Sequence, residues 1–302
     1  MSSMLRIAAV GAAAAFVLTA PVSAGSVKPS NKEERAIHFM YTPQYARQIG
    51  RVPNANTGQM EYFGGPVFSK VQVVSVMWGP NVSQATVQGM PGFLKALPNS
   101  TFQDQLGEYS TKGLVGVDGH KGTNQTIKRG GFLGQFVITP KNTKTTISNR
   151  DIRIELAYQI ANGNLPAQNQ NNLYMIYFPS NVTIVAFGIQ SCSSFGAYHY
   201  SSSGHKHSTN VYYGVMPDCG YSFESHTIIS AHEFAEATSD NIPTPGTNPK
   251  YPQAWNTSDG YEIGDLCQGT SGQLVTKKTT YYVQQVYLNS TAGCSTGNYT
   301  SP

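Results

Sequence analysis

Residues 228–240 combine histidine and carboxylate side chains at a spacing that suits metal-dependent hydrolysis. His232 and Glu236 are four residues apart, so on a helix both lie on one face. The spacing is that of the HExxH helix of metallopeptidases, in which the first and fifth positions bind zinc and the second is the general base. Here a glutamate replaces the second histidine. We therefore expect His232 and Glu236 to be metal ligands and Glu233 to be the base that activates water.

A second carboxylate pair lies in the segment 261–267, where Glu262 and Asp265 are three residues apart. Cys267 follows directly, and a disulfide there would hold both carboxylates in place. Either one could complete the shell of a metal. The alternative is a solvated turn in which Asp265 caps its own backbone.

The other histidines have weaker contexts. His199 lies on a strand expected at 197–201 and is a further candidate ligand, with a structural role as the alternative. His226 falls in the first turn of the helix and is expected on the surface. His205 and His207 belong to a Ser/Gly-rich segment that reads as an exposed loop. Trp255, between the two carboxylate segments, is expected to form a wall of the cleft.

Acidic residues are scarce, yet seven of the sixteen lie between Glu224 and Asp265, where Lys250 is the only basic residue. A buried carboxylate without a partner is costly, and a divalent cation would satisfy several at once. Carboxylates can bind zinc, but an oxygen-rich shell also suits calcium, manganese or magnesium. We expect one divalent metal, zinc first, with calcium or no metal as the alternatives.

The elements that must position these residues follow from the apolar pattern. The helix expected at 225–239 has small and apolar residues on its remaining faces, so it should be packed on most sides. The expected fold class is α/β (α+β): a single zincin-like domain with a mixed β-sheet packed by helices and a late active-site helix. The other expected elements are strands at 71–78, 114–117, 173–178, 182–187, 197–201 and 211–215, helices at 83–97 and 149–162, and a hairpin at 274–288.

The first residues predict export. Arg6 precedes an apolar run at 7–18, and Val22-Ser23-Ala24 fits the cleavage rule of a secretory signal peptide. The alternative, a membrane anchor, needs about 20 apolar residues, more than this run has. We expect a signal peptide at 1–24, an extended leader or pro-segment at 25–65, and a mixed α/β domain with a C-terminal β-hairpin region at 66–302. The mature protein would be secreted, extracellular or periplasmic.

Cysteine number and charge agree with export. Four cysteines form an even set that usually pairs in an oxidising compartment; of three possible pairings we favour Cys192–Cys219 with Cys267–Cys294. Charged residues make up only 12% of the chain, with no basic block that would mark a nucleic-acid site. The expected partner is a peptide or cell-wall substrate, with no nucleic acid, no membrane after signal cleavage, and a monomeric state.

Several of these motifs together resemble the EXORDIUM / phosphate-induced protein family. The similar stretches are 228–236, Gln253-Ala254-Trp255 and 262–267, with weaker similarity at 62–67, at 195–200 and at Cys219. The family has Thr-Asn-Pro after its helix, whereas this chain has Ser239-Asp240-Asn241. The resemblance covers roughly residues 60–294 and implies a secreted or wall-associated protein linked to growth signalling and cell expansion.

Three functions remain open at this stage. The first is a metallopeptidase that uses the HExxE helix and the ExxD segment. The second is a non-catalytic extracellular or cell-wall-associated binding or signalling protein of the EXORDIUM type. The third is a glycoside hydrolase in which Glu233 and Glu262 form the carboxylate pair.

Overall fold

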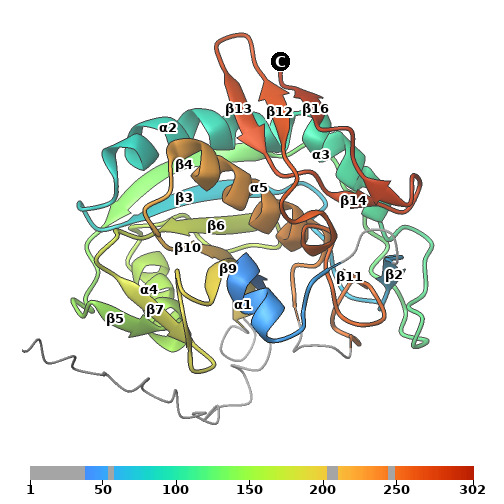
Figure 1. Cartoon of the computed structure of the whole chain (residues 1–302), viewed down its shortest axis with the longest axis horizontal. Helices are drawn as coiled ribbons and strands as arrows, with labels where there is room; N and C mark the ends of the chain where they lie inside the picture. The colour runs from blue at the N-terminus through green and yellow to red at the C-terminus, as the bar shows by residue number, and fades with distance from the viewer. Residues whose placement is uncertain (1–37, 54–57, 203–209, 244–248) are drawn as a thin grey trace, which may run out of the picture.

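The computed structural model describes residues 38–53, 58–202, 210–243 and 249–302 (Figure 1). A six-stranded sheet with strand order β1-β9-β10-β6-β3-β4 forms its centre. Strands β10, β6, β3 and β4 run parallel, whereas β9 is antiparallel to β10 and β1 is antiparallel to β9. The strands are β1 His38–Tyr41, β3 Gln72–Trp78, β4 Gly131–Ile138, β6 Asn172–Tyr177, β9 Phe195–Ser202 and β10 Val211–Met216.

Helices cover both faces of this mixed sheet, so that both of its faces are buried. α2 (Gln84–Ala96) and α5 (Phe223–Ser239) pack on one face, and α4 (Asn149–Ala161) packs on the other (Figure 1). Strand β9 shows the alternation that builds the two layers. Its Ala197 joins the core on the α5 side, whereas Tyr198 and Tyr200 join the core on the α4 side.

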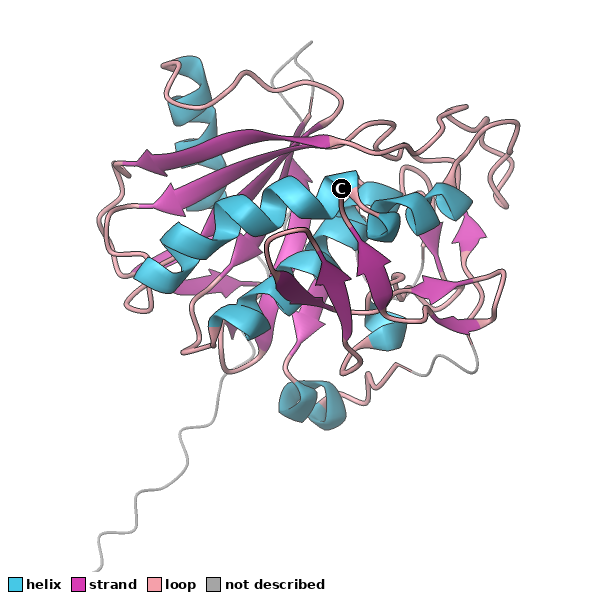
Figure 2. Cartoon of the chain, turned by 90° about the horizontal axis from the view of Figure 1, so that it is seen from above, coloured by secondary structure: helices cyan, strands magenta, loops and turns pink. Residues whose placement is uncertain are grey.

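The C-terminal residues form a second layer over α5. Strands β13, β12 and β16 make a small sheet, and β13 contacts α5 from the side opposite the central sheet (Figure 2). Helix α5 is thus enclosed, and every residue from Ile229 to Ser239 is buried. The remaining elements are α1 Pro43–Gln48, α3 Thr101–Gln105, β2 Glu61–Tyr62, β5 Thr146–Ser148, β7 Thr183–Ala186, β8 Ile189–Gln190, β11 Trp255–Asn256, β12 Gly272–Val275, β13 Thr280–Val283, β14 Tyr287–Leu288, β15 Gly293–Cys294, β16 Asn298–Thr300, and the 3₁₀ turns η2 Leu97–Asn99, η3 Leu106–Tyr109 and η4 Asp265–Cys267.

The expected α/β (α+β) class, with a mixed sheet packed by helices, is confirmed, and so are most expected elements. The strand at 71–78, the helices at 83–97, 149–162 and 225–239, and the strands near 173, 197 and 211 all form. Ser148 caps α4. Its hydroxyl accepts from the Asp151 backbone N–H, and the Asp151 carboxylate accepts in return from the Ser148 backbone, which makes a capping box.

One expected strand does not form, and one observed strand was not expected. Residues 114–117 make only an isolated bridge between Val115 and Lys121, and both Val115 and Val117 are exposed, so no buried face supports a strand. Strand β4 was not predicted, because most of its side chains are half-exposed and Gly131 and Gly134 dilute its apolar pattern.

The expectation of a leader without core residues at 25–65 is wrong for its described part. β1 joins the central sheet, and Phe39, Met60, Tyr62 and Phe63 are buried. The expected signal peptide at 1–24 lies outside the described residues. Within the described part of the chain, no helix is long and apolar enough to cross a membrane.

Both favoured disulfides form. Cys192 bonds to Cys219, and Cys267 bonds to Cys294. The first joins the start of β9 to the loop before α5. The second joins the 261–267 segment to β15. The strand β9 and the 261–267 segment, which lie on different sides of α5, are therefore each anchored by a disulfide.

Candidate functional site

Helix α5 carries the centre of the candidate site. It begins at the N-cap Ser222, whose hydroxyl accepts from the Ser225 backbone N–H. Because the helix is enclosed, His232, Glu233 and Glu236 point into the protein and are at most 2% exposed. His232 Nε2 lies 3.0 Å from Glu236 Oε1, as expected for positions four apart on one face.

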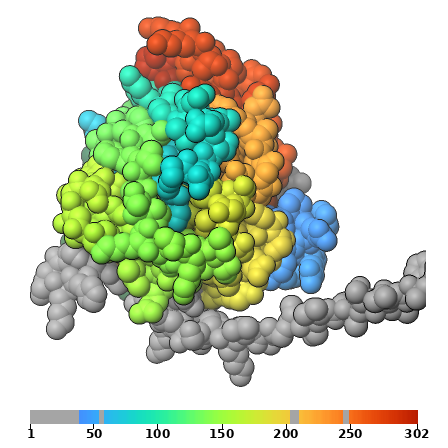
Figure 3. Space-filling view, turned by 90° about the vertical axis from the view of Figure 1, so that its left-hand side faces the viewer, coloured from blue at the N-terminus to red at the C-terminus, as the bar shows by residue number. Residues whose placement is uncertain are grey.

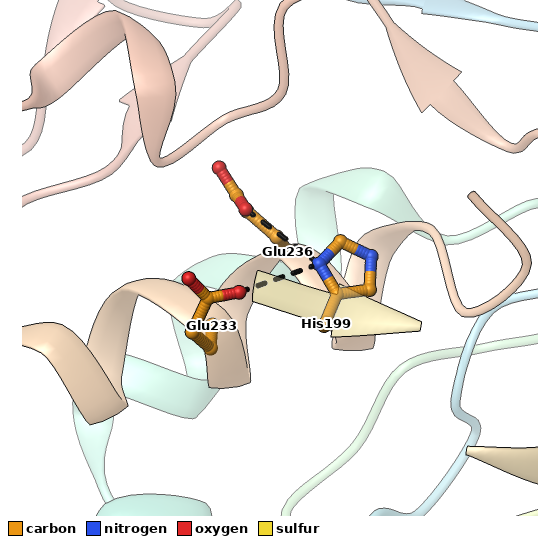
Figure 4. Close-up of side chains that lie close together, drawn as sticks. All are labelled: His199, Glu233 and Glu236. Carbon is orange, nitrogen blue, oxygen red and sulfur yellow. Dashed lines mark ion pairs between the residues drawn. The ribbon is translucent and has the colours of Figure 1, made fainter. Parts of the chain in front are cut away.

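Strand β9 brings His199 against this helix (Figure 4). Its Nδ1 lies 3.6 Å from Glu233 Oε2 and 3.6 Å from Glu236 Oε2. The other ring nitrogen, Nε2, lies 3.0 Å from the Asp240 carbonyl oxygen and 3.6 Å from Glu262 Oε1. Side chains two residues apart on a strand lie on the same face of the sheet, so His199 faces α5 as Ala197 does.

The 261–267 segment closes the site from a third direction. The Asp265 backbone N–H donates to Glu236 Oε1 at 3.1 Å, and the Glu262 N–H donates to Asp265 Oδ2 at 3.1 Å. Gly264 permits this approach, since a Cβ there would lie 2.8 Å from both Glu236 Oε1 and His232 Nδ1. The Asp265 backbone is thus bonded to the helix, while its half-exposed carboxylate caps its own turn, as the alternative expects.

Gln284, just after β13, was not predicted as a site residue. Its amide Nε2 lies 2.8 Å from His232 Nδ1 and donates to the Gly264 carbonyl at 2.7 Å. A half-turn of the amide would place its oxygen beside Nδ1 as an acceptor instead. Gln284 therefore sets the orientation of the His232 ring. No sequence signal marks it, because its role depends on a contact 52 residues away.

Asp240, at the end of α5, has a structural role. Its carboxylate accepts from the Ala254 backbone N–H at 3.0 Å and from Asn256 Nδ2 at 2.7 Å. These bonds attach the end of the helix to β11. Trp255 packs between Tyr62 and Tyr109, with ring centroids 5.3 Å apart in each pair, and supports this junction.

Among the described histidines, His226 and His120 do not join the site. His226 was expected on the surface, and this is wrong: it is 4% exposed and its Nδ1 lies 2.9 Å from Thr86 Oγ1, because α2 packs over the first turns of α5. His120 stacks on Tyr251 with ring centroids 4.3 Å apart. His205 and His207 lie outside the described residues.

Burial and charge together shift the pKa values of the site. Burial lowers the pKa of His232, but the Glu236 carboxylate outweighs it and raises that pKa to about 10. Burial raises the pKa of Glu236, but His232 and His199 outweigh it, so Glu236 stays ionised well below its usual range. The pKa of His199 also rises well above its usual value, because the attraction of Glu262 and its neighbours exceeds the effect of burial.

The other carboxyl groups hold protons more tightly than usual. Burial, followed by repulsion from Glu236, raises the pKa of Asp265 to about 7. Burial also raises the pKa values of Glu233 and Glu262. Bound protons thus offset part of the negative charge of the carboxylates in the site. A divalent cation could offset the same charge.

The donor atoms fit a metal ion. Two groups of three residues each offer ligand atoms within 4.8 Å of one another: His199, Glu233 and Glu236 form one, and His232, Glu236 and Asp265 form the other. His199 Nδ1, His232 Nε2 and both Glu233 oxygens are buried without a hydrogen-bond partner. Such atoms are rare in a folded protein and call for an ion or a water molecule. The second group contains three expected ligands and leaves Glu233 beside it, in the position of the expected base.

A cavity of about 330 Å³ adjoins the site at the start of α5. It is lined mainly by apolar atoms from Met40, Ile228 and Ile229, and by Gln284, which also contacts His232. The cavity therefore ends at Gln284, which separates it from the His232 ring.

Comparison of the chain with models of known protein families, with curated proteins and with solved structures finds no match. The function must therefore be argued from the site itself.

Proposed function

We propose that the protein is a secreted metal-dependent peptidase, with one divalent ion held by His232, Glu236 and Asp265. The observation that carries the proposal is the convergence of histidine and carboxylate atoms at ligand spacing from two distant segments, with His232 Nε2 and both Glu233 oxygens buried without a hydrogen-bond partner. A mixed nitrogen and oxygen donor set favours zinc over calcium, which takes six to eight oxygens. Zinc supplies Lewis acidity that lowers the pKa of water and polarises a peptide carbonyl.

The chain's own residues have distinct roles in this proposal. Glu233 accepts the proton from water, since its carboxylate lies beside the ligand group. Burial raises the pKa of Glu233 toward neutral pH, which suits a general base. His199 holds the Glu233 carboxylate at 3.6 Å, and the Asp240 carbonyl holds His199 in turn. Gln284 orients His232, as an outer-shell partner of a histidine ligand does.

The cluster of site side chains consists of His199, His232, Glu233, Glu236, Glu262 and Asp265. The burial of all of them except Asp265 supports one alternative, a structural ion in a non-catalytic extracellular protein of the EXORDIUM type. The glycosidase alternative has less support. Glu233 and Glu262 contact opposite nitrogens of the His199 ring, at 3.6 Å each, so the ring occupies the space where a sugar would have to lie.

Replacement of Glu233 by glutamine tests the proposal. We expect Glu233→Gln to retain zinc but to cleave a fluorogenic peptide library at least 100-fold more slowly than the wild type, as for loss of a general base. Glu224→Gln, at an exposed position in the first turn of the same helix, is the matched control and should keep full activity. Unchanged activity in Glu233→Gln would contradict the role of Glu233 as the general base. If the zinc-loaded wild type cleaves no peptide, the structural ion is favoured over the peptidase.

A further inference from the structure

Strand β1 covers an edge of the central sheet that lies beside the candidate site. β1 pairs antiparallel with β9, with Phe39 opposite Tyr198 and Met40 opposite Ala197. On its other edge β9 pairs with β10 from Val211–Ser202 to Val215–Tyr198, so β9 keeps its place without β1. The backbone groups of β9 next to His199 are thus available to any extended chain that replaces β1.

The N-terminal segment, residues 38–53, also closes the approach to the cluster. The Tyr41 carbonyl accepts from Gln268 Nε2 at 2.6 Å, and Arg51 Nη2 donates to the Gly260 carbonyl at 3.0 Å. These bonds lie on either side of the Glu262–Asp265 stretch. Apart from Asp265, the cluster side chains are at most 2% exposed, so a substrate cannot reach them while the segment is docked.

The segment is held mainly through β1 and the residues next to it. Figure 3 shows it in blue on the surface, against the yellow and orange parts of the chain. In α1 only Ala46 is buried, and Ile49 and Val52 are exposed. The main anchors are the Phe39 ring, 4.7 Å from the Phe195 ring centroid, and the Thr42 N–H, which donates to the Ser194 carbonyl at 2.9 Å.

We infer that the β9 edge is a binding site for an extended peptide, and that residues 38–53 occupy it in this structure as an intramolecular substitute. The bound peptide adds a strand to β9 through backbone hydrogen bonds, and alternate side chains give specificity. One side chain takes the place of Met40, which lines the 330 Å³ cavity with Ile228 and Ile229. Its neighbour takes the place of Phe39 on the other face, so the preferred peptide has an aromatic residue followed by an unbranched apolar one.

The inference deepens the proposed function, because it names the ligand and explains why the site is closed. The bound strand would place a backbone carbonyl beside His199 and the end of α5. Removal or displacement of the N-terminal segment would then be the step that opens the site.

The test uses the full chain with both anchors removed. The Phe39→Ala/Thr42→Pro double variant is compared with Ile49→Ala/Val52→Ala, which changes exposed residues of the same segment. The probe is a fluorescein-labelled peptide with the sequence of residues 38–48, and binding is measured by anisotropy in excess EDTA. We expect the double variant to bind at least ten times more tightly than both the wild type and the control, with the amides of β9 protected from hydrogen exchange when the probe is bound.

Equal binding by all three proteins, with the amides of β3 and β6 still protected, would overturn the inference. If the double variant loses the protection of the β3 and β6 amides, it has unfolded. The single variant Thr42→Pro is then compared with the wild type and the control in the same way. The measurement in EDTA separates this inference from the proposed function. If the double variant binds the probe more tightly but the protein shows no zinc-dependent cleavage, the peptide site stands and the peptidase proposal fails. If the protein cleaves peptides but the double variant binds no more tightly, the peptidase proposal stands and the peptide site fails.

Discussion

Two glutamates of the site should respond oppositely to the same substitution. Glu236 is ionised and contacts His232 at 3.0 Å, His199 at 3.6 Å and the Asp265 N–H at 3.1 Å. Burial raises the pKa of Glu262 well above its usual value, so glutamine is a closer match for its carboxyl group than for that of Glu236. Glutamine matches the size and charge of a protonated glutamate but removes the charge of an ionised one.

The expected free energies follow from these states. In metal-free protein, Glu236→Gln leaves the His232 cation buried without its partner, which costs about 3–5 kcal/mol. Glu262→Gln removes a carboxyl group whose charged form burial already disfavours and keeps a similar volume, so it should cost less than about 1 kcal/mol. The difference, about 2 kcal/mol or more, corresponds to about 1 M in the urea midpoint for a slope of 1–3 kcal/mol per molar.

Urea unfolding at pH 7 in EDTA, followed by fluorescence with the disulfides intact, measures this difference. The wild type and Glu224→Gln serve as references, because Glu224 is exposed at the start of the same helix. Equal losses in both variants, or a larger loss in Glu262→Gln, would refute the assignment of charge within the cluster.

Three further predictions concern the same site. In EDTA the protein should lose stability as pH rises from 5 to 9. Burial raises the folded-state pKa of Asp265 to about 7, so the stabilisation from protonated Asp265 is complete below its unfolded pKa near 3.8 and is lost as pH rises through 7. The stabilisation from the His232 cation is lost as pH rises toward 10, and flat urea midpoints from pH 5 to 9 would contradict the prediction. Gly264→Ala should cost about 1–3 kcal/mol because its Cβ would lie 2.8 Å from Glu236 Oε1, whereas Gly107→Ala, with 3.7 Å to the nearest atom, should cost less than about 1 kcal/mol. Gln284→Leu should weaken zinc binding about 10–100-fold in competition with a chelating dye while the fold is kept, and wild-type affinity would show that Gln284 does not orient His232.

The sequence predicted the elements that carry strong local patterns. Helix α5 was expected from its small and apolar faces, and strands β3, β6, β9 and β10 from their buried β-branched and aromatic residues. Strand β4 was missed because its exposed face and two glycines give no such pattern. The N-terminal segment was read as a polar leader, because the pairing of β1 depends on β9, more than 150 residues later.

The candidate site was predicted in composition but not in detail. The spacing of His232 and Glu236 and the pair Glu262 and Asp265 identified the side chains that the fold brings together, and His199 joins them. The spacing could not predict Gln284 or the role of Gly264, since both act through contacts between distant segments. It also could not predict that nearly all of the cluster is buried, which follows from the C-terminal sheet and the N-terminal segment.

Metal content of the purified protein tests the central claim most directly. The wild type and Glu236→Gln are each dialysed against zinc and then against buffer, and zinc is measured per chain by elemental mass spectrometry. The account predicts one zinc per chain for the wild type and less than a tenth of that for Glu236→Gln, because Glu236 belongs to both possible ligand groups. No zinc in the wild type, or equal zinc in the two proteins, would contradict it.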